Sequence, residues 1–162
     1  MNLNESQNVA LILVGLPGCG KSTLIGSLKA SGWITFDDYK AGAIDNCSAF
    51  RKSQHFQSLI ASLRRGHNCA LADIDFCDVI ARAEGLRVLQ DEIPGLCVDW
   101  VFFSHDEQAC EANIRRRNRD SLQSDLNALR RYSKVYTIPK GVKERPVVSC
   151  CKSPIPPPPE SS

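Results

Sequence analysis

The sequence of 162 residues has no long hydrophobic run, and the apolar run nearest its start covers only residues 8–14. A run of that length is too short to span a bilayer, and the polar residues before it lack the positive charge of a secretion signal. The net charge is only +2, which provides no global attraction to nucleic acid or to an anionic membrane. These absences predict a cytoplasmic protein with no membrane partner.

The eight cysteines form no CxxC pair, and no Cys/His cluster has the spacing of a zinc site. Most of them lie in apolar stretches, where a reduced thiol packs as a small hydrophobic side chain. Cys19 differs because it lies in a glycine-rich loop before a helix, a position that lowers the pKa of a thiol. It is either a redox-sensitive thiol or simply a small side chain that fits the loop.

Signatures of other nucleotide-binding and nucleic-acid-binding classes are also missing. No DxxG motif follows the third apolar run and no NKxD motif is present, which argues against a GTPase. The tryptophans and tyrosines are scattered, so no aromatic platform for single-stranded nucleic acid is predicted.

What is present is a regular alternation of two kinds of segment. Apolar, β-prone runs predict five strands, and amphipathic segments between them predict helices. The strands are expected at 8–14, 33–36, 68–73, 96–103 and 146–150, and the helices at 21–32, 44–66, 78–95, 105–119 and 121–136. Such alternation predicts an α/β sandwich of three layers, with helices on both faces of a parallel sheet. We expect one domain over residues 1–150 and a proline-rich disordered tail over 151–162.

The sequence GLPGCGKS at residues 15–22 fits the pattern GxxxxGK(S/T) between the first strand and the first helix. Its glycines allow backbone N–H groups to turn inward around an anion, and the helix N-terminus adds its dipole. Lys21 supplies a charge for the β- and γ-phosphates, and the Ser22 hydroxyl is an oxygen ligand suited to Mg²⁺. The motif predicts an ATP–Mg²⁺ site contacted by Gly15, Pro17, Gly18, Cys19, Gly20, Lys21, Ser22 and Thr23.

Acidic residues follow the second and third strands, at the sheet edge where ligands of such folds bind. Asp37 can accept the proton of an incoming hydroxyl or help to hold the metal, or it is a turn or helix-capping residue. Asp73 is expected to hold Mg²⁺, and Asp75 either assists it or caps the next helix.

Basic residues outnumber acidic ones between Glu111 and Arg145, and four arginines crowd positions 115–119. Arg115 and Arg119 share one face of a continuous helix at i, i+4. The arginines either form a basic lid that neutralises charge during phosphoryl transfer or are a solvated charge run.

Together these segments resemble the P-loop kinases related to phage polynucleotide kinase, to zeta-toxin-like proteins and to small predicted kinases labelled AAA. The resemblance covers about residues 8–138 and rests on GLPGCGKSTL, FDDYK, LADID and NIRRRNRD. It implies a P-loop NTPase fold with strand order 2-3-1-4-5 and a basic lid, with Asp37 as the general base. It also implies that Asp73 ends the third strand as the family's aspartate does, and that Arg115 and Arg119 form the lid's RxxxR pair.

In the family an arginine that binds substrate phosphate follows the two aspartates, and Lys40 stands there in this chain. Lysine keeps the charge but loses the bidentate fork, which weakens the case for a nucleic-acid substrate.

The sequence therefore predicts a kinase that transfers the γ-phosphate of ATP–Mg²⁺ to a hydroxyl. The acceptor is a nucleoside, a nucleotide, a polynucleotide end or a small metabolite, bound by Asp37 and Lys40. The alternative is an ATP-binding regulatory module with no second substrate. A standalone polynucleotide kinase would bind oligonucleotides in a salt-sensitive way.

Overall fold

The computed structural model describes residues 8–37, 48–51, 53, 55–117 and 119–149. Its elements, with η1 a 3₁₀-helix, are β1 (Val9–Val14), α1 (Lys21–Ala30), β2 (Ile34–Phe36), α2 (Ser48–Arg51), α3 (Phe56–Arg64), β3 (Cys69–Ala72), η1 (Ile74–Cys77), α4 (Val79–Glu92), β4 (Cys97–Phe102), α5 (Glu107–Arg117) and α6 (Leu122–Ser133). No helix in these residues has both the length and the apolar character needed to cross a bilayer. The expected tail at 151–162 lies outside the described residues.

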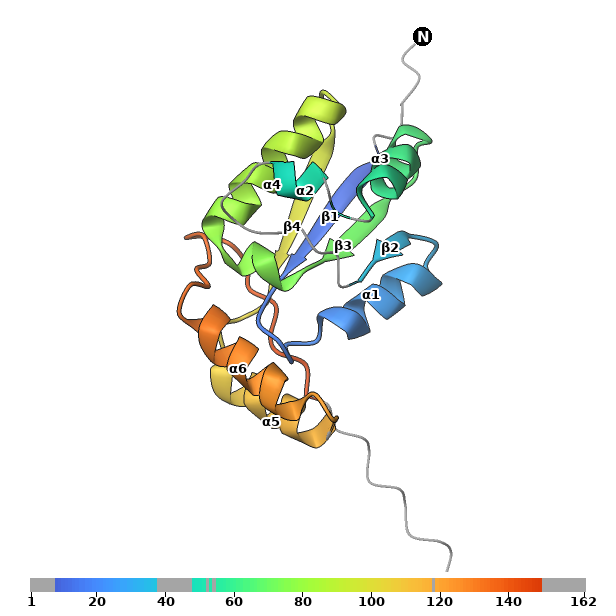
Figure 1. The fold of residues 1–162 in the computed structure, drawn as a ribbon. Helices are drawn as coiled ribbons and strands as arrows, with labels where there is room; N and C mark the ends of the chain where they lie inside the picture. Colours follow the sequence, from blue (N-terminus) through green and yellow to red (C-terminus); the bar gives the residue numbers. More distant parts are fainter. Residues whose placement is uncertain (1–7, 38–47, 52, 54, 118, 150–162) are drawn as a thin grey trace, which may run out of the picture.

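The strands form one parallel sheet of order β2-β3-β1-β4 (Figure 1). Every residue of β3 is buried, and β1 pairs with β3 on one side and with β4 on the other. Unbroken apolar runs suit strands covered on both faces, which is why these two can occupy the centre of the sheet. The expected parallel α/β sheet and the relative order of its first four strands are confirmed.

Helices cover this sheet and extend beyond one end of it. α1 packs against β2 and β3, α3 packs against β3, and α4 packs against α2 and η1. α5 and α6 pack together at the end of the sheet where β1 leads into α1 (Figure 1). The loop between β1 and α1 therefore lies between the sheet and this helix pair.

The fifth strand expected at 146–150 is wrong for the described part of that segment. Only one residue pair forms a bridge there, Phe103 with Arg145, in parallel orientation. Pro146 follows, and because proline lacks an N–H it cannot continue the ladder. Val148 instead donates its N–H to the carbonyl of Cys19, at 3.1 Å. The segment thus leaves the sheet and contacts the glycine-rich loop.

The single long helix expected at 44–66 is also wrong. Its described part forms two short helices, α2 and α3, separated by a turn in which Ser53 N–H bonds to Phe50 O and Phe56 N–H bonds to Ser53 O. Phe50 and Phe56 are both buried and meet edge to face, with ring centroids 5.6 Å apart. The apolar spacing identified the buried residues, but two helices joined by a turn satisfy it as well as one does.

Arg82 on α4 ties three parts of the fold together from a buried position. Its guanidinium donates to the carbonyls of Phe76, Cys77 and Thr137 at 2.8 to 3.1 Å and stands over the ring of Phe102. The burial lowers the pKa of this guanidinium from its ordinary value. Because the carbonyls of η1 depend on it, Arg82 helps to hold the turn that follows Asp73.

We predict that Arg82→Met lowers the free energy of unfolding by about 3 kcal/mol, since it leaves several carbonyls without their donor. Chemical denaturation measures this change. Arg87 on the same helix is the control, because its pairs with Glu84 and Asp91 are exposed, and Arg87→Met should cost less than about 1 kcal/mol. Equal losses in the two variants would contradict the role assigned to Arg82.

Candidate phosphate-binding site

The glycine-rich loop, residues 15–22, adopts a backbone that its glycines make possible. Gly18 and Gly20 have φ of 83° and 109°, values that residues with a side chain rarely adopt. A Cβ on Gly18 would also lie 2.6 Å from the carbonyl oxygen of Cys110 on α5. The loop is thus shaped by its own torsions and by close packing against α5.

Several backbone N–H groups of this loop have no partner within the described chain. The N–H of Cys19 donates to Leu16 O at 3.1 Å, whereas those of Gly18, Gly20, Lys21 and Ser22 donate no hydrogen bond there. Unpaired N–H groups at the start of a helix, next to glycines of positive φ, are the ordinary donors for a bound phosphate. This part of the loop is therefore suited to an anion.

Lys21 is the first residue of α1, and its ammonium lies over the loop. Its Nζ donates to the carbonyl oxygens of Gly15 and Leu16, at 2.6 and 3.0 Å. The carbonyl of Gly15 also accepts a hydrogen bond from the buried thiol of Cys77. The Nζ of Lys21 also donates to Cys19 Sγ at 3.6 Å. None of the acceptors of Lys21 is a carboxylate, so a phosphate could compete for the charge of the ammonium.

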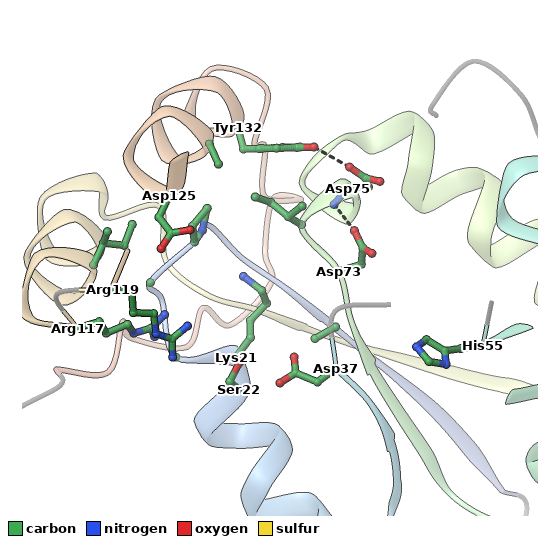
Figure 2. Close-up of a pocket in the computed structure, with 17 residues that line it drawn as sticks. Lys21, Ser22, Asp37, His55, Asp73, Asp75, Arg117, Arg119, Asp125 and Tyr132 are labelled. Atoms are coloured by element: carbon green, nitrogen blue, oxygen red, sulfur yellow. Dashed lines mark hydrogen bonds between the residues drawn. The ribbon is translucent and has the colours of Figure 1, made fainter. Parts of the chain in front are cut away.

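A cavity of about 800 Å³ lies beside the loop and has a volume typical of ligand-binding clefts. Residues of the loop, of the ends of β2 and β3, and of α5 and α6 line it. Figure 2 shows the Lys21 side chain directed into the cavity, with two arginines on one side of it and the carboxylates of Asp37 and Asp73 on the other. Of the residues expected to bind nucleotide, Pro17, Gly18, Gly20, Lys21 and Ser22 line it, and Gly15, Cys19 and Thr23 do not.

The two strand-end aspartates reach the cavity in different states of burial. Asp37, the residue after β2, is exposed to it, whereas Asp73, the residue after β3, is only 4% exposed. Asp73 also accepts the N–H of Asp75 at 2.7 Å, which caps η1 and fixes its carboxylate. Lys40, expected to bind the acceptor, lies outside the described residues.

The donor set fits a magnesium ion. The Ser22 hydroxyl and the Asp73 carboxylate line the same cavity, and both are the hard oxygen ligands that Mg²⁺ prefers. No cluster of three His, Cys, Asp or Glu side chains able to hold a metal occurs in the described residues. An ion here would take its remaining ligands from water and from phosphate oxygens, which is usual for Mg²⁺.

Asp75 connects the sheet to α6. Its carboxylate accepts a hydrogen bond of 2.7 Å from the hydroxyl of Tyr132, and both side chains line the cavity (Figure 2). Burial and this hydrogen bond raise the pKa of Tyr132 above its usual value. Of the two roles open for Asp75 from the sequence, capping belongs to Asp73 and Asp78, which cap η1 and α4. Sequence reasoning did not identify Tyr132.

The arginines do not lie as helical spacing suggests. α5 ends at Arg117, so Arg119 lies beyond the helix and does not share a helical face with Arg115. The Arg115 side chain is 54% exposed and forms an ion pair with Glu111 at 2.7 Å. Arg117 and Arg119, in contrast, line the cavity. The pair available to a bound phosphate is therefore Arg117 and Arg119.

Three buried cysteines, Cys19, Cys77 and Cys110, lie in or behind the loop and away from solvent. Cys19 is fully buried, so of the two possibilities for it the packing one fits its surroundings. Burial raises the pKa of both Cys77 and Cys110 to about 12. Because only the thiolate is nucleophilic, a pKa of this size leaves about 10⁻⁴ of either thiol reactive at pH 8.

We predict that iodoacetamide at pH 8 modifies the half-buried Cys97 in the native protein and leaves Cys77 and Cys110 unmodified until denaturant is added. Mass spectrometry of timed digests measures this order. Modification of Cys77 as fast as that of Cys97 would contradict the packing behind the loop.

No family model and no curated protein matches the sequence. Solved structures do match the fold. The crystal structure of APE1195 superimposes with a TM-score of 0.53 at 17% identity, over 88% of this chain and 86% of that one. A chain of the Pnkp1/Rnl/Hen1 RNA repair complex matches with a TM-score of 0.47 at 16% identity, over 85% of this chain and 50% of that one. A gluconokinase from Sinorhizobium meliloti 1021 matches with a TM-score of 0.46 at 15% identity, over 87% and 81%.

At these identities the likeness extends to the fold alone. The chain has an α/β fold with a parallel sheet of order 2-3-1-4, and it shares this fold with APE1195. The expected resemblance is confirmed at that level, and its functional content has to be argued from the site.

Proposed function

We propose that this protein is a kinase that transfers the γ-phosphate of ATP to the hydroxyl of an acceptor. The observation that carries the proposal is the meeting, in one cavity, of the loop's unpaired N–H groups with Lys21 and two strand-end carboxylates. An anion-binding loop alone would serve many functions. The carboxylate of Asp37, exposed in the same cavity, adds a group that can accept a proton.

In this mechanism the N–H groups of Gly18, Gly20 and Lys21 hold the β- and γ-phosphates, and the Lys21 ammonium turns from the loop carbonyls toward them. Ser22 and Asp73 would hold Mg²⁺, which would supply positive charge to stabilise the negative phosphates. Asp37 accepts the hydroxyl proton as the acceptor oxygen bonds to the γ-phosphorus, the bond to the β-phosphate oxygen breaks, and ADP leaves.

Arg117 and Arg119 supply the charge that the transferring phosphoryl group needs. Both arginines line the cavity on one side of Lys21, and Asp37, the proposed base, lies on the other side (Figure 2). Fixed cations around the transferring group stabilise the charge on its equatorial oxygens. This assigns to Arg117 and Arg119 the role that sequence spacing gave to Arg115 and Arg119.

A screen of acceptors with γ-labelled ATP and Mg²⁺ tests the proposal. Nucleosides, nucleotides, sugars and oligonucleotide ends are the acceptors, and Lys21→Ala is the blank. Label transfer to one acceptor class by the wild type alone supports a kinase. ATP hydrolysis without transfer to any acceptor would instead favour the nucleotide-dependent regulatory module.

A further inference from the structure

Asn113 is a buried polar side chain on the apolar face of α5. It is 2% exposed, and its neighbours on that face, Cys110 and Ile114, are buried as well. Its amide nitrogen donates to Gly18 O at 2.8 Å and to Val148 O at 2.6 Å. Since both partners are carbonyl oxygens, only the nitrogen of the amide can face them. One side chain therefore joins α5 to the glycine-rich loop and to the segment after Pro146.

These contacts fix the direction of the loop's peptide groups. Val148, whose carbonyl Asn113 holds, donates its own N–H to Cys19 O at 3.1 Å. In a trans peptide the C=O and the next N–H point in opposite directions, and the described chain contains no cis peptide. Holding Cys19 O on the outside of the loop thus directs the N–H of Gly20 to the other side, and Gly20 lines the cavity.

The same side chain also fixes α5 relative to the loop. Ile114 and Arg117, on this helix, line the cavity, and the carbonyl of Cys110 lies against Gly18. Movement of α5 would therefore shift Arg117 and the Gly18 carbonyl together. Precise placement of donors around a phosphate decides how strongly they bind it.

We propose that Asn113 is a positioning residue for the nucleotide's phosphates: by holding Val148, whose N–H bonds to Cys19 O, it directs the N–H of Gly20 into the cavity, and by holding Gly18 O it sets the position of α5 and its Arg117 relative to the loop. This inference rests on the proposed function, because it concerns the same phosphate site. Asn113 touches no reacting atom.

The test replaces Asn113 with aspartate, which has the same shape but presents oxygens to two carbonyls. We expect the Kd of Mg–ATP to rise by about tenfold or more, with inorganic tripolyphosphate losing affinity in parallel. Asn113→Ala, which adds no charge, should weaken both ligands in the same direction. Asn127→Asp is the matched control, since Asn127 is exposed on α6 and bonds only to Gln123 among the contacts described.

The readout separates positioning from mere stability. A structural role alone would lower the melting temperature and leave the Kd of the folded protein unchanged, and that result would overturn the inference. Wild-type protein that binds no triphosphate would refute the proposed function itself, whereas wild-type binding with equal binding by both Asn113 variants would refute only this inference.

If neither variant folds, NMR of the wild-type protein tests the role of Asn113. The side-chain amide protons of Asn113 should exchange with solvent far more slowly than those of Asn127, and their NMR signals should shift when Mg–ATP saturates the site. Exchange as fast as that of Asn127, or signals unmoved by Mg–ATP, would overturn the inference.

Discussion

Replacing Lys21 with methionine is expected to lower kcat/KM for phosphoryl transfer by about 10³-fold, the range seen when one preorganised charge contact to a transition state is removed. Methionine keeps the unbranched stem and removes the ammonium, so the change isolates the charge. In the resting site this ammonium is held by the carbonyls of Gly15 and Leu16. Neutral oxygens compete weakly with a polyphosphate, so the charge is available to ATP.

Lys29→Met is the matched control for this prediction. Lys29 is exposed in the last turn of the same helix and does not line the cavity, so its loss should leave transfer within about twofold of wild type. A steady-state assay with the acceptor found by the label screen measures both variants. Transfer by Lys21→Met at a rate close to that of wild type would contradict the phosphate role of the loop.

Asp37→Asn is expected to lower kcat by about 10²-fold or more while the Kd of Mg–ATP stays unchanged. The amide keeps the size and the hydrogen-bonding capacity of the carboxylate but cannot accept the proton of the acceptor hydroxyl. Asp37 lies after β2, on the opposite side of Lys21 from the arginines, so its loss should not disturb the triphosphate (Figure 2).

Asp99→Asn, an exposed aspartate on β4 that does not line the cavity, is the control and should be silent. Single-turnover transfer and equilibrium binding, measured on the same preparations, separate catalysis from affinity. If Asp37→Asn transfers phosphate as fast as wild type, Asp37 is not the base. If ATP affinity falls with the rate, Asp37 acts on the nucleotide or its metal instead.

The fold could be predicted from the sequence wherever local pattern determines structure. The runs that became β1 and β3 are apolar along their whole length, and this is sufficient for central parallel strands. The spacing of apolar residues does not predict where a helix is interrupted, because tertiary contacts decide whether it continues. The helix expected at 44–66 breaks at Ser53, because packing of Phe50 on Phe56 satisfies the apolar spacing without one continuous helix.

Some residues of the candidate site could likewise be predicted from local sequence, and others could not. The loop and its lysine are contiguous in sequence and could be identified from spacing, and Asp37 and Asp73 could be identified as the residues that follow strands. α5 ends at Arg117, two residues before Arg119, so the expected i, i+4 pair does not form on one helix face, and Arg117 rather than Arg115 lines the cavity with Arg119.

Asn113 had one signal in the sequence, a polar residue between Cys110 and Ile114 on a buried helix face. Its partners, Gly18 and Val148, lie 95 and 35 residues away along the chain. Tyr132 and Asp75 are similarly 57 residues apart. Contacts of this range are set by the packing of whole elements, which spacing within one segment does not report.

Equilibrium dialysis of labelled Mg–ATP against the wild-type protein measures whether the loop of residues 15–22 binds a polyphosphate. We expect retention of ATP, displacement of the label by inorganic tripolyphosphate, and little displacement by adenosine, because the N–H groups and Lys21 would contact only the phosphates. Absence of retention with millimolar protein and either purine triphosphate, or displacement by adenosine but not by tripolyphosphate, would contradict polyphosphate binding by the loop.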